Sequence, residues 1–269
     1  MCIRALDYCP AVDITFGEYL RAIITADVEM LPTDRLFYRV AFIEAFRNRG
    51  IVPSDVRTMS EQSLMWNSLA DPTPAWLPAM LDSVDITWDL HLDRTTIFKT
   101  NEDNRWKVWR ALKRVFKADP SLYSQFGLVA ELPRFDRDGR VISVPAAGET
   151  TFDVFSVRPA RRVGPDGSFL TDIVIIVHQR RVVPLDGVDP ANGWFWFRGG
   201  ATLLVDSRKS HEMVRYCIVK NAGSASRMER QRATAGGQGD QALRSLYFGA
   251  TVAEPFALLH AEEWMSDDA

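Results

Sequence analysis

Few residues in this chain are of the kinds that build catalytic centres. Its 269 residues include three cysteines and four histidines. Cys2, Cys9 and Cys217 lack the CxxC spacing of zinc and redox sites, so we expect reduced thiols and a cytoplasmic protein. The histidines, at positions 91, 178, 211 and 260, stand far apart. HExxH, GxSxG, P-loop and GxGxxG motifs are all missing. The sequence therefore contains no catalytic motif, and we expect no cofactor to bind to it alone.

Long apolar runs and a strong imbalance of charge are also missing. No segment reaches the roughly 18 apolar residues of a membrane-spanning helix, so no membrane partner is expected. The opening residues, MCIRALDYCP, lack the basic and apolar regions of a secretory signal. The formal net charge is −3, which gives the chain as a whole no particular attraction to nucleic acid.

Helical patterns fill the first half of the sequence. Thr15 and Glu18 have the capping-box spacing at the start of TFGEYLRAIITAD. A second helix is predicted over DRLFYRVAFIEAFRNRG, with Gly50 as its C-terminal stop. Its apolar face contains Leu36, Val40, Phe42, Ile43 and Phe46. Ser60 is predicted to cap a shorter helix.

Alternating patterns replace the helical ones in the second half. Residues 150–181 read as two strands around a turn at 164–167. The run Ile173–Val177 is apolar throughout, which predicts a central strand covered on both faces. GWFWFRGGATLLVD and VRYCIVKN follow as strands, and Ser224–Arg232 returns to helix. Short helices are expected in ALRSLYFG and PFALLHAEEW.

These elements predict an α+β fold in two parts. Residues 1–126 form a helical region, and residues 127–269 form a mainly antiparallel sheet with a short helical tail. WFWF at 194–197 has aromatic side chains on both faces of a strand, which predicts burial between layers. Gly199 and Gly200 favour a bulge or close packing over a phosphate-binding loop.

The stretch DITWDLHLD, residues 85–93, alternates polar and apolar side chains. Asp89, His91 and Asp93 would share one face of a strand, which makes them candidate metal ligands. Alternate positions on a strand are about 6–7 Å apart, too far to converge on one ion without further ligands. The spacing favours an edge strand whose charges oppose pairing with other strands, and a metal site is the alternative.

One predicted helix has a basic face. Thr100 suits its N-cap, and Val108, Leu112 and Val115 align on its apolar side. Cations three or four residues apart form a stripe on the opposite side: Lys107, Arg110, Arg114 and Lys117. Such a stripe is typical of phosphate or nucleic-acid binding, although charged helix faces are more often only solvated. These four cations are the predicted binding residues.

Two patterns near the N-terminus resemble a known protein class. Residues 23–27 read IITAD and residues 45–51 read AFRNRGI. The pair is similar to the ILxAD and AFxxRGL patterns in the helical C-terminal subdomain of gluzincin metallopeptidases, the thermolysin-like and fungalysin-like group. Residues 154–181, 197–206 and 214–220 are similar to a sheet domain appended to related bacterial proteins of uncharacterised function.

The resemblance implies the part of such a protein that follows the zinc-binding HExxH motif. We therefore expect a non-catalytic accessory module that acts through protein contacts, its partner being an upstream or separate metallopeptidase-like chain. One alternative is the C-terminal half of a zinc metallopeptidase, whose HExxH portion and zinc are supplied upstream or by a separate chain. The other is phosphate or nucleic-acid binding through the basic helix.

Overall fold

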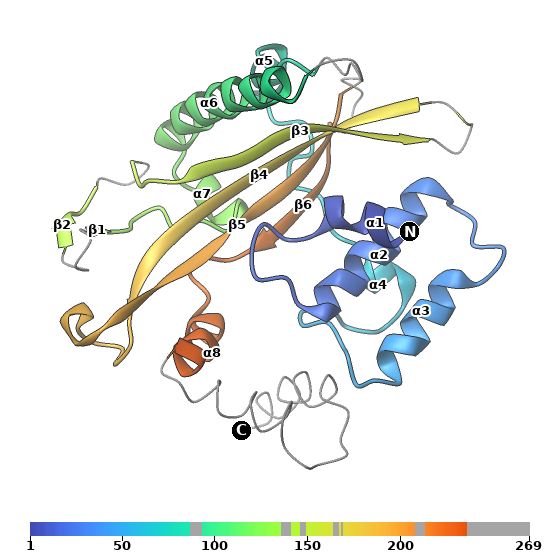
Figure 1. The fold of residues 1–269 in the computed structure, drawn as a ribbon, viewed down its shortest axis with the longest axis horizontal. Helices are drawn as coiled ribbons and strands as arrows, with labels where there is room; N and C mark the ends of the chain where they lie inside the picture. Colours follow the sequence, from blue (N-terminus) through green and yellow to red (C-terminus); the bar gives the residue numbers. More distant parts are fainter. Residues whose placement is uncertain are drawn as a thin grey trace.

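The computed structural model describes residues 1–86, 93–135, 141–145, 149–163, 167, 169–207 and 213–235. Within these ranges the chain has the predicted α+β fold: helices precede a four-stranded antiparallel sheet, and one helix follows it (Figure 1). Several predicted features lie outside the described residues: Asp89, His91, most of the turn at 164–167, and the segments ALRSLYFG and PFALLHAEEW.

Short helices and one long one make up the N-terminal part: α1 (Cys2–Ala5), η1 (Leu6–Tyr8), α2 (Phe16–Met30), α3 (Tyr38–Arg47) and α4 (Glu61–Leu64). The predicted capping box starts α2, because the Thr15 hydroxyl accepts from the Glu18 amide at 3.2 Å and the Glu18 carboxylate accepts from the Thr15 amide at 2.8 Å. Ser60 caps α4, as predicted. The sequence thus predicted the N-caps of α2 and α4 correctly.

Helix α3 begins later than its sequence pattern indicates. The Asp34 carboxylate accepts from the amides of Tyr38, at 3.0 Å, and Arg39, at 2.8 Å, and so satisfies the free end of the helix. Phe37 precedes the helix in a left-handed conformation with φ of 55°. The residues before Tyr38 thus form a tight turn, not a first helical turn.

The buried side of α3 is narrower than the sequence pattern predicts. Ile43 is buried as predicted, but Leu36 is 69% exposed and Val40 is 50% exposed, so the predicted apolar face is wrong at these two positions. Gly50 ends the helix as predicted. It has φ of +69°, and the Ile51 amide donates to the Phe46 carbonyl at 3.0 Å.

Three further helices follow: α5 (Leu77–Asp82), the 25-residue α6 (Arg94–Ala118) and α7 (Leu122–Gln125). Helix α6 starts well before Thr100, so the prediction of that residue as the cap is wrong. Asp93 is the N-cap, and its carboxylate accepts from the Thr96 amide and hydroxyl, both at 2.9 Å. A carboxylate is as good a cap as threonine, and the residues between the two are helical.

The main sheet has the strand order β3-β4-β5-β6, with every neighbouring pair antiparallel. Its strands are β3 (Asp153–Val163), β4 (Phe169–Pro184), β5 (Trp194–Asp206) and β6 (Val214–Lys220). A smaller pair, β1 (Arg134–Phe135) and β2 (Val141–Ser143), precedes it, and η2 (Pro190–Asn192) and α8 (Ala225–Ala235) complete the described elements. The β3–β4 hairpin and the central position of Ile173–Val177 confirm the predictions.

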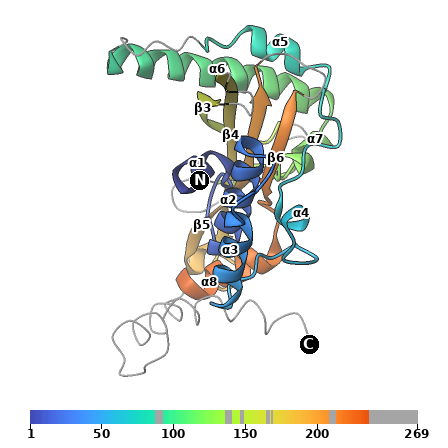
Figure 2. The same ribbon diagram turned by 90° about the vertical axis from the view of Figure 1, so that its right-hand side faces the viewer.

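Helices cover parts of both faces of this sheet (Figures 1 and 2). On one face, Ile173, Ile175 and Val177 share a core with α5, α6 and α7. On the other, Leu204 and Ile218 share a core with α1 and α2. Helix α6 runs along β3 and the N-terminal helices lie near β6, so the two helical groups flank the sheet.

The start of β5 departs from its sequence pattern. Phe197 is buried, but Trp194 and Phe195 are half-buried and Trp196 is 37% exposed, so the prediction that both faces are covered is wrong. Figure 1 shows this end of the β4–β5 hairpin extending past α6 and the N-terminal helices. Gly199 confirms the expected close packing, because a Cβ there would lie 2.3 Å from the Ala222 nitrogen.

Candidate binding site

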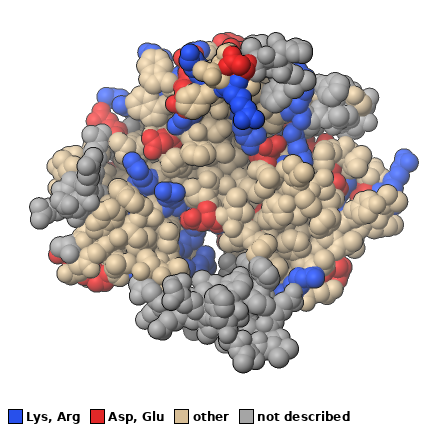
Figure 3. Space-filling view, in the orientation of Figure 1, with Lys and Arg blue, Asp and Glu red and all other residues tan. Residues whose placement is uncertain are grey.

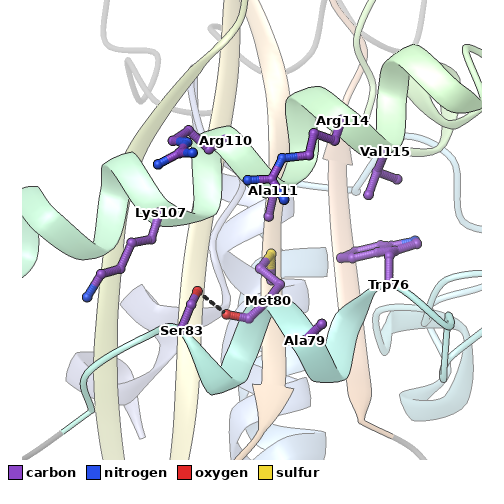
Figure 4. Close-up of a pocket in the computed structure, with 9 residues that line it drawn as sticks. All are labelled: Trp76, Ala79, Met80, Ser83, Lys107, Arg110, Ala111, Arg114 and Val115. Atoms are coloured by element: carbon purple, nitrogen blue, oxygen red, sulfur yellow. Dashed lines mark hydrogen bonds between the residues drawn. The ribbon is translucent and has the colours of Figure 1, made fainter.

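A pocket between α5 and α6 brings together most of the predicted basic stripe (Figure 4). The cavity has a volume of about 340 Å³. It combines cations with apolar and small side chains from both helices: Trp76, Ala79, Met80, Ser83, Lys107, Arg110, Ala111, Arg114 and Val115. A mostly apolar hollow with a few charged groups at its wall is the usual composition of a small binding site.

Helical spacing explains why these side chains meet. Positions 107, 110, 111, 114 and 115 follow the i, i+3, i+4 pattern and share one side of α6, which faces α5. The adjacent side is buried against the sheet through Val108, Leu112 and Phe116. Val115 therefore lies beside the cations in the pocket, although the sequence pattern places it on the opposite side. The buried side fixes the rotation of α6 and so orients the cations.

The three pocket cations differ in their surroundings. The Lys107 ammonium forms an ion pair with Asp103 at 2.6 Å. The Arg110 guanidinium lies 4.3 Å from the centre of the Trp106 ring. Arg114 is exposed and forms no ion pair with any residue that the structure describes. Arg114 is consequently the cation best placed to meet an incoming anion.

The fourth residue of the predicted stripe lies outside the pocket. The Lys117 ammonium forms an ion pair with Glu149 at 2.8 Å. The hydrogen bond and the charge of this carboxylate raise the pKa of Lys117. All four cations of the predicted stripe lie on α6: three are at the pocket, and one is paired with the segment before β3.

Sequence reasoning missed the half of the pocket that α5 contributes. Prolines at positions 72, 74 and 78 are typical of turns, but Pro78 occupies the first turn of α5, where the missing amide removes no helical hydrogen bond. Met80 is buried and Trp76 is half-buried beside it. Trp76 and Met80 follow Pro74 and are four residues apart, which is helical spacing. This pattern was the indication of a short helix in the sequence.

The predicted metal ligands are not brought together within the described residues. Asp93 caps α6, and the Thr96 amide and hydroxyl lower the pKa of its carboxyl. Its predicted place on an edge strand is wrong, because it begins a helix. Asp89 and His91 lie outside the described residues. Among the residues that are described, no three metal-ligating side chains form a cluster.

The buried thiols have little nucleophilic character. All three cysteines are free. Burial raises the pKa of Cys217 to about 12 and, with the charges of Glu18 and Asp7, that of Cys9 to about 11.

Comparisons with known proteins leave the α5–α6 pocket as the main guide to function. Among the described helices, none combines the length and apolar character needed to span a bilayer. No protein-family model, curated protein or solved structure matches this chain.

Proposed function

We propose that the chain is a non-catalytic binding module that acts through protein contacts, and that the α5–α6 pocket receives an acidic, amphipathic segment of its partner. The single observation that supports this proposal is the placement of Lys107, Arg110 and Arg114 around an apolar hollow. Such a site suits a peptide that presents a carboxylate beside an apolar side chain.

The apolar part of the pocket supports a peptide over a simple anion. Trp76 and Met80 from α5 face Ala111 and Val115 from α6, so an apolar side chain entering the pocket would lose contact with water on several sides. A free phosphate has no apolar group to place there. The guanidinium of Arg114, at the wall of the same cavity, supplies a charge-assisted hydrogen bond to a carboxylate.

The ion pairs along α6 also favour a compact acidic group over a polyanion. Lys107 and Lys117 already face the carboxylates of Asp103 and Glu149. A nucleic-acid backbone needs a continuous row of cations, and these acidic neighbours reduce the field along the row. A single carboxylate at Arg114 needs no such continuity.

The resemblance to gluzincins suggests the kind of partner. Residues 23–27 and 45–51 carry the patterns that are similar to the subdomain following the zinc site. We propose on that basis that the partner is a metallopeptidase-like chain, upstream or separate, which holds the zinc. The purified chain is then expected to contain no stoichiometric zinc by plasma mass spectrometry. Zinc that is present and is lost in His91→Ala would contradict the proposal.

A peptide-binding measurement tests the pocket. The probe is a fluorescein-labelled peptide of about 12 residues that alternates glutamate and leucine, titrated with the chain and followed by fluorescence anisotropy. Arg114→Ala is expected to weaken binding about 10-fold, since it removes one charge-assisted hydrogen bond. Trp76→Ala is expected to weaken it by a similar factor through lost apolar contact.

Lys99→Ala is the matched control. Lys99 is an exposed cation on the same helix and does not line the pocket, so its removal should leave the affinity within about two-fold. A peptide with glutamine in place of glutamate should bind more weakly. Equal binding of the two peptides, or an equal loss in Lys99→Ala and Arg114→Ala, would refute the proposed site.

A further inference from the structure

A second surface, on the sheet and apart from the α5–α6 pocket, combines exposed aromatic rings with cations. We call it the sheet patch, and it consists of Phe155 on β3, His178 and Arg180 on β4, and Trp196 and Arg198 on β5. Phe155 is 61% exposed and Trp196 is 37% exposed. Both arginines are exposed, and His178 is half-buried. Exposed aromatic side chains are informative where they gather with other groups on one surface, as these two do.

Strand register places these residues on one face. Arg180 and Arg198 are directly paired across β4 and β5, and His178 pairs with Gly200. Trp196 and His178 each stand two positions from one of the paired arginines, so their side chains point the same way. Phe155 lies at the irregularity between Val154 and Ser156 in β3, which frees its side chain from strict alternation.

Ring contacts join the members of the sheet patch. The Phe155 and His178 rings meet edge to face, with centroids 5.7 Å apart. The Arg180 guanidinium lies 5.1 Å from the centre of the Trp196 ring. The Trp194 ring supports Trp196 edge to face at 5.1 Å. The two exposed rings, Phe155 on β3 and Trp196 on β5, therefore each contact a side chain of the strand between them, β4.

Three arginines, Arg105, Arg180 and Arg198, and one carboxylate, Asp153, act electrostatically on His178 in the sheet patch. Burial lowers the pKa of His178, and the charges of Arg198 and Arg180 lower it further, against the opposite effect of Asp153. The Asp153 carboxylate lies 3.8 Å from the His178 ring nitrogen and offsets part of the positive charge of the arginines. In Figure 3, cationic side chains lie beside an uncharged area over the β4–β5 hairpin. A net acidic chain thus has a local surface suited to anions.

We propose that the sheet patch binds single-stranded nucleic acid. Bases would stack on Phe155 and Trp196, and backbone phosphates would pair with Arg180 and Arg198. Aromatic side chains on an antiparallel sheet are a general means of holding unpaired bases, because every base presents a flat face to stack. A duplex hides those faces, so it would meet only the two arginines. In a nucleic-acid strand phosphates alternate with bases, which matches the alternation of arginines and aromatic rings in the sheet patch. A protein partner would not require this alternation.

Fluorescence anisotropy of labelled oligonucleotides tests this proposal. The probes are an oligouridylate and an oligodeoxyuridylate of about 12 nucleotides, long enough for a single-strand site. Binding of either supports the proposal, and the stronger of the two identifies RNA or DNA as the source through the 2′-hydroxyl. Phe155→Ala and Trp196→Ala are each expected to weaken binding about 10-fold. Arg180→Ala and Arg198→Ala should each reduce the slope of log affinity against log salt by about 0.7.

Matched substitutions on α6 separate this site from others. Phe98→Ala removes a side chain that is 65% exposed, and Arg94→Ala removes an exposed cation; neither should change the affinity. Thermal melting monitored by circular dichroism establishes that each variant is folded. The proposal is overturned if neither oligonucleotide binds at low salt, or if a duplex of the same length binds as tightly. It is also overturned if Lys107→Ala or Arg114→Ala abolishes binding while the sheet-patch variants do not, since α6 would then be the nucleic-acid site.

Discussion

Arg39 illustrates how a single charged residue holds the N-terminal helices together. Its side chain is 1% exposed and forms an ion pair with Asp27 at 2.8 Å, and it also binds Glu61 and the Leu31 carbonyl. Replacing Arg39 with leucine would leave the buried Asp27 carboxylate without its cation. We expect Arg39→Leu to lower the free energy of unfolding by about 3–5 kcal/mol, measured by urea denaturation.

Arg47→Leu is the control for this prediction. Arg47 forms an ion pair with Glu44 at 2.7 Å on the exposed side of α3, with 59% of its side chain exposed. Pairs of this kind contribute less than about 1 kcal/mol. If the two substitutions changed the stability equally, burial of the Arg39 cluster would have no special importance.

The cysteines allow a second test at the scale of single residues. Cys2 is exposed, whereas Cys9 and Cys217 are buried and have raised pKa values of about 11 and about 12. Thiolates are the reactive form, so near pH 8 the folded chain should show one fast-reacting thiol with Ellman's reagent and three after unfolding. Cys2→Ser should remove the fast reaction. Rapid labelling of Cys217 in that variant would show that the β6 region opens readily.

At the scale of elements, the start of α6 depends on the Asp93 carboxylate. Its pKa lies below the ordinary value of 3.8 because the Thr96 amide and hydroxyl donate to the ionised form. A group with a lowered pKa in the folded state stabilises fully above its unfolded value, and the effect is lost as the pH falls through the folded value. Asp93→Ala should therefore lower the urea midpoint by a constant amount between about pH 5 and 7 and by progressively less below about pH 4.

Asp93→Ser provides the comparison for this helix cap. A serine hydroxyl caps a helix without titrating in this range, so the difference between the serine and alanine variants should not change with pH. If the difference between wild type and Asp93→Ala persisted undiminished at low pH, another group would be responsible for the effect.

Elements with strong local features could be predicted from the sequence. The Thr15–Glu18 capping box, the Gly50 stop and the β3–β4 hairpin all formed as expected, because each depends on neighbours in the chain. Boundaries that depend on competing caps were wrong. Asp93 and Thr100 both suit a helix start, and the helix begins at the earlier one, where the Asp93 carboxylate accepts from the Thr96 amide and hydroxyl.

The candidate pocket was only half predictable for the same reason. The stripe on α6 is a matter of spacing within one helix, so its residues could be read from the sequence. The apolar hollow exists because α5 packs beside α6. No pattern within α6 predicts which other helix will pack against it. The exposed Trp196 was missed likewise, since the length of the β4–β5 hairpin relative to the helices is a property of the whole fold.

On the scale of the whole molecule, the helical region and the sheet share their cores. Val108, Leu112 and Phe116 of α6 belong to one cluster with Val157 and Ile173 of the sheet. On the other face, Ala22 and Ile23 of α2 pack with Leu204 and Ile218. The Lys220 ammonium also binds the Glu18 carboxylate, which joins β6 to α2. The predicted boundary at residue 126 therefore falls within a continuous interior.

This shared interior leads to a prediction about fragments. Residues 1–126 alone would expose the side of α6 that faces the sheet, including three of its fully buried apolar residues, Val108, Leu112 and Phe116. Each large apolar side chain left in water costs about 1.5–3 kcal/mol. The three together would therefore remove a large share of the roughly 5–15 kcal/mol by which a typical domain is stable. We expect the fragment to lack a cooperative thermal transition by circular dichroism, while the full chain unfolds in one transition with coincident tryptophan fluorescence and circular dichroism. Cooperative unfolding of the separate fragment would mean that the α6–sheet core joins two independent domains.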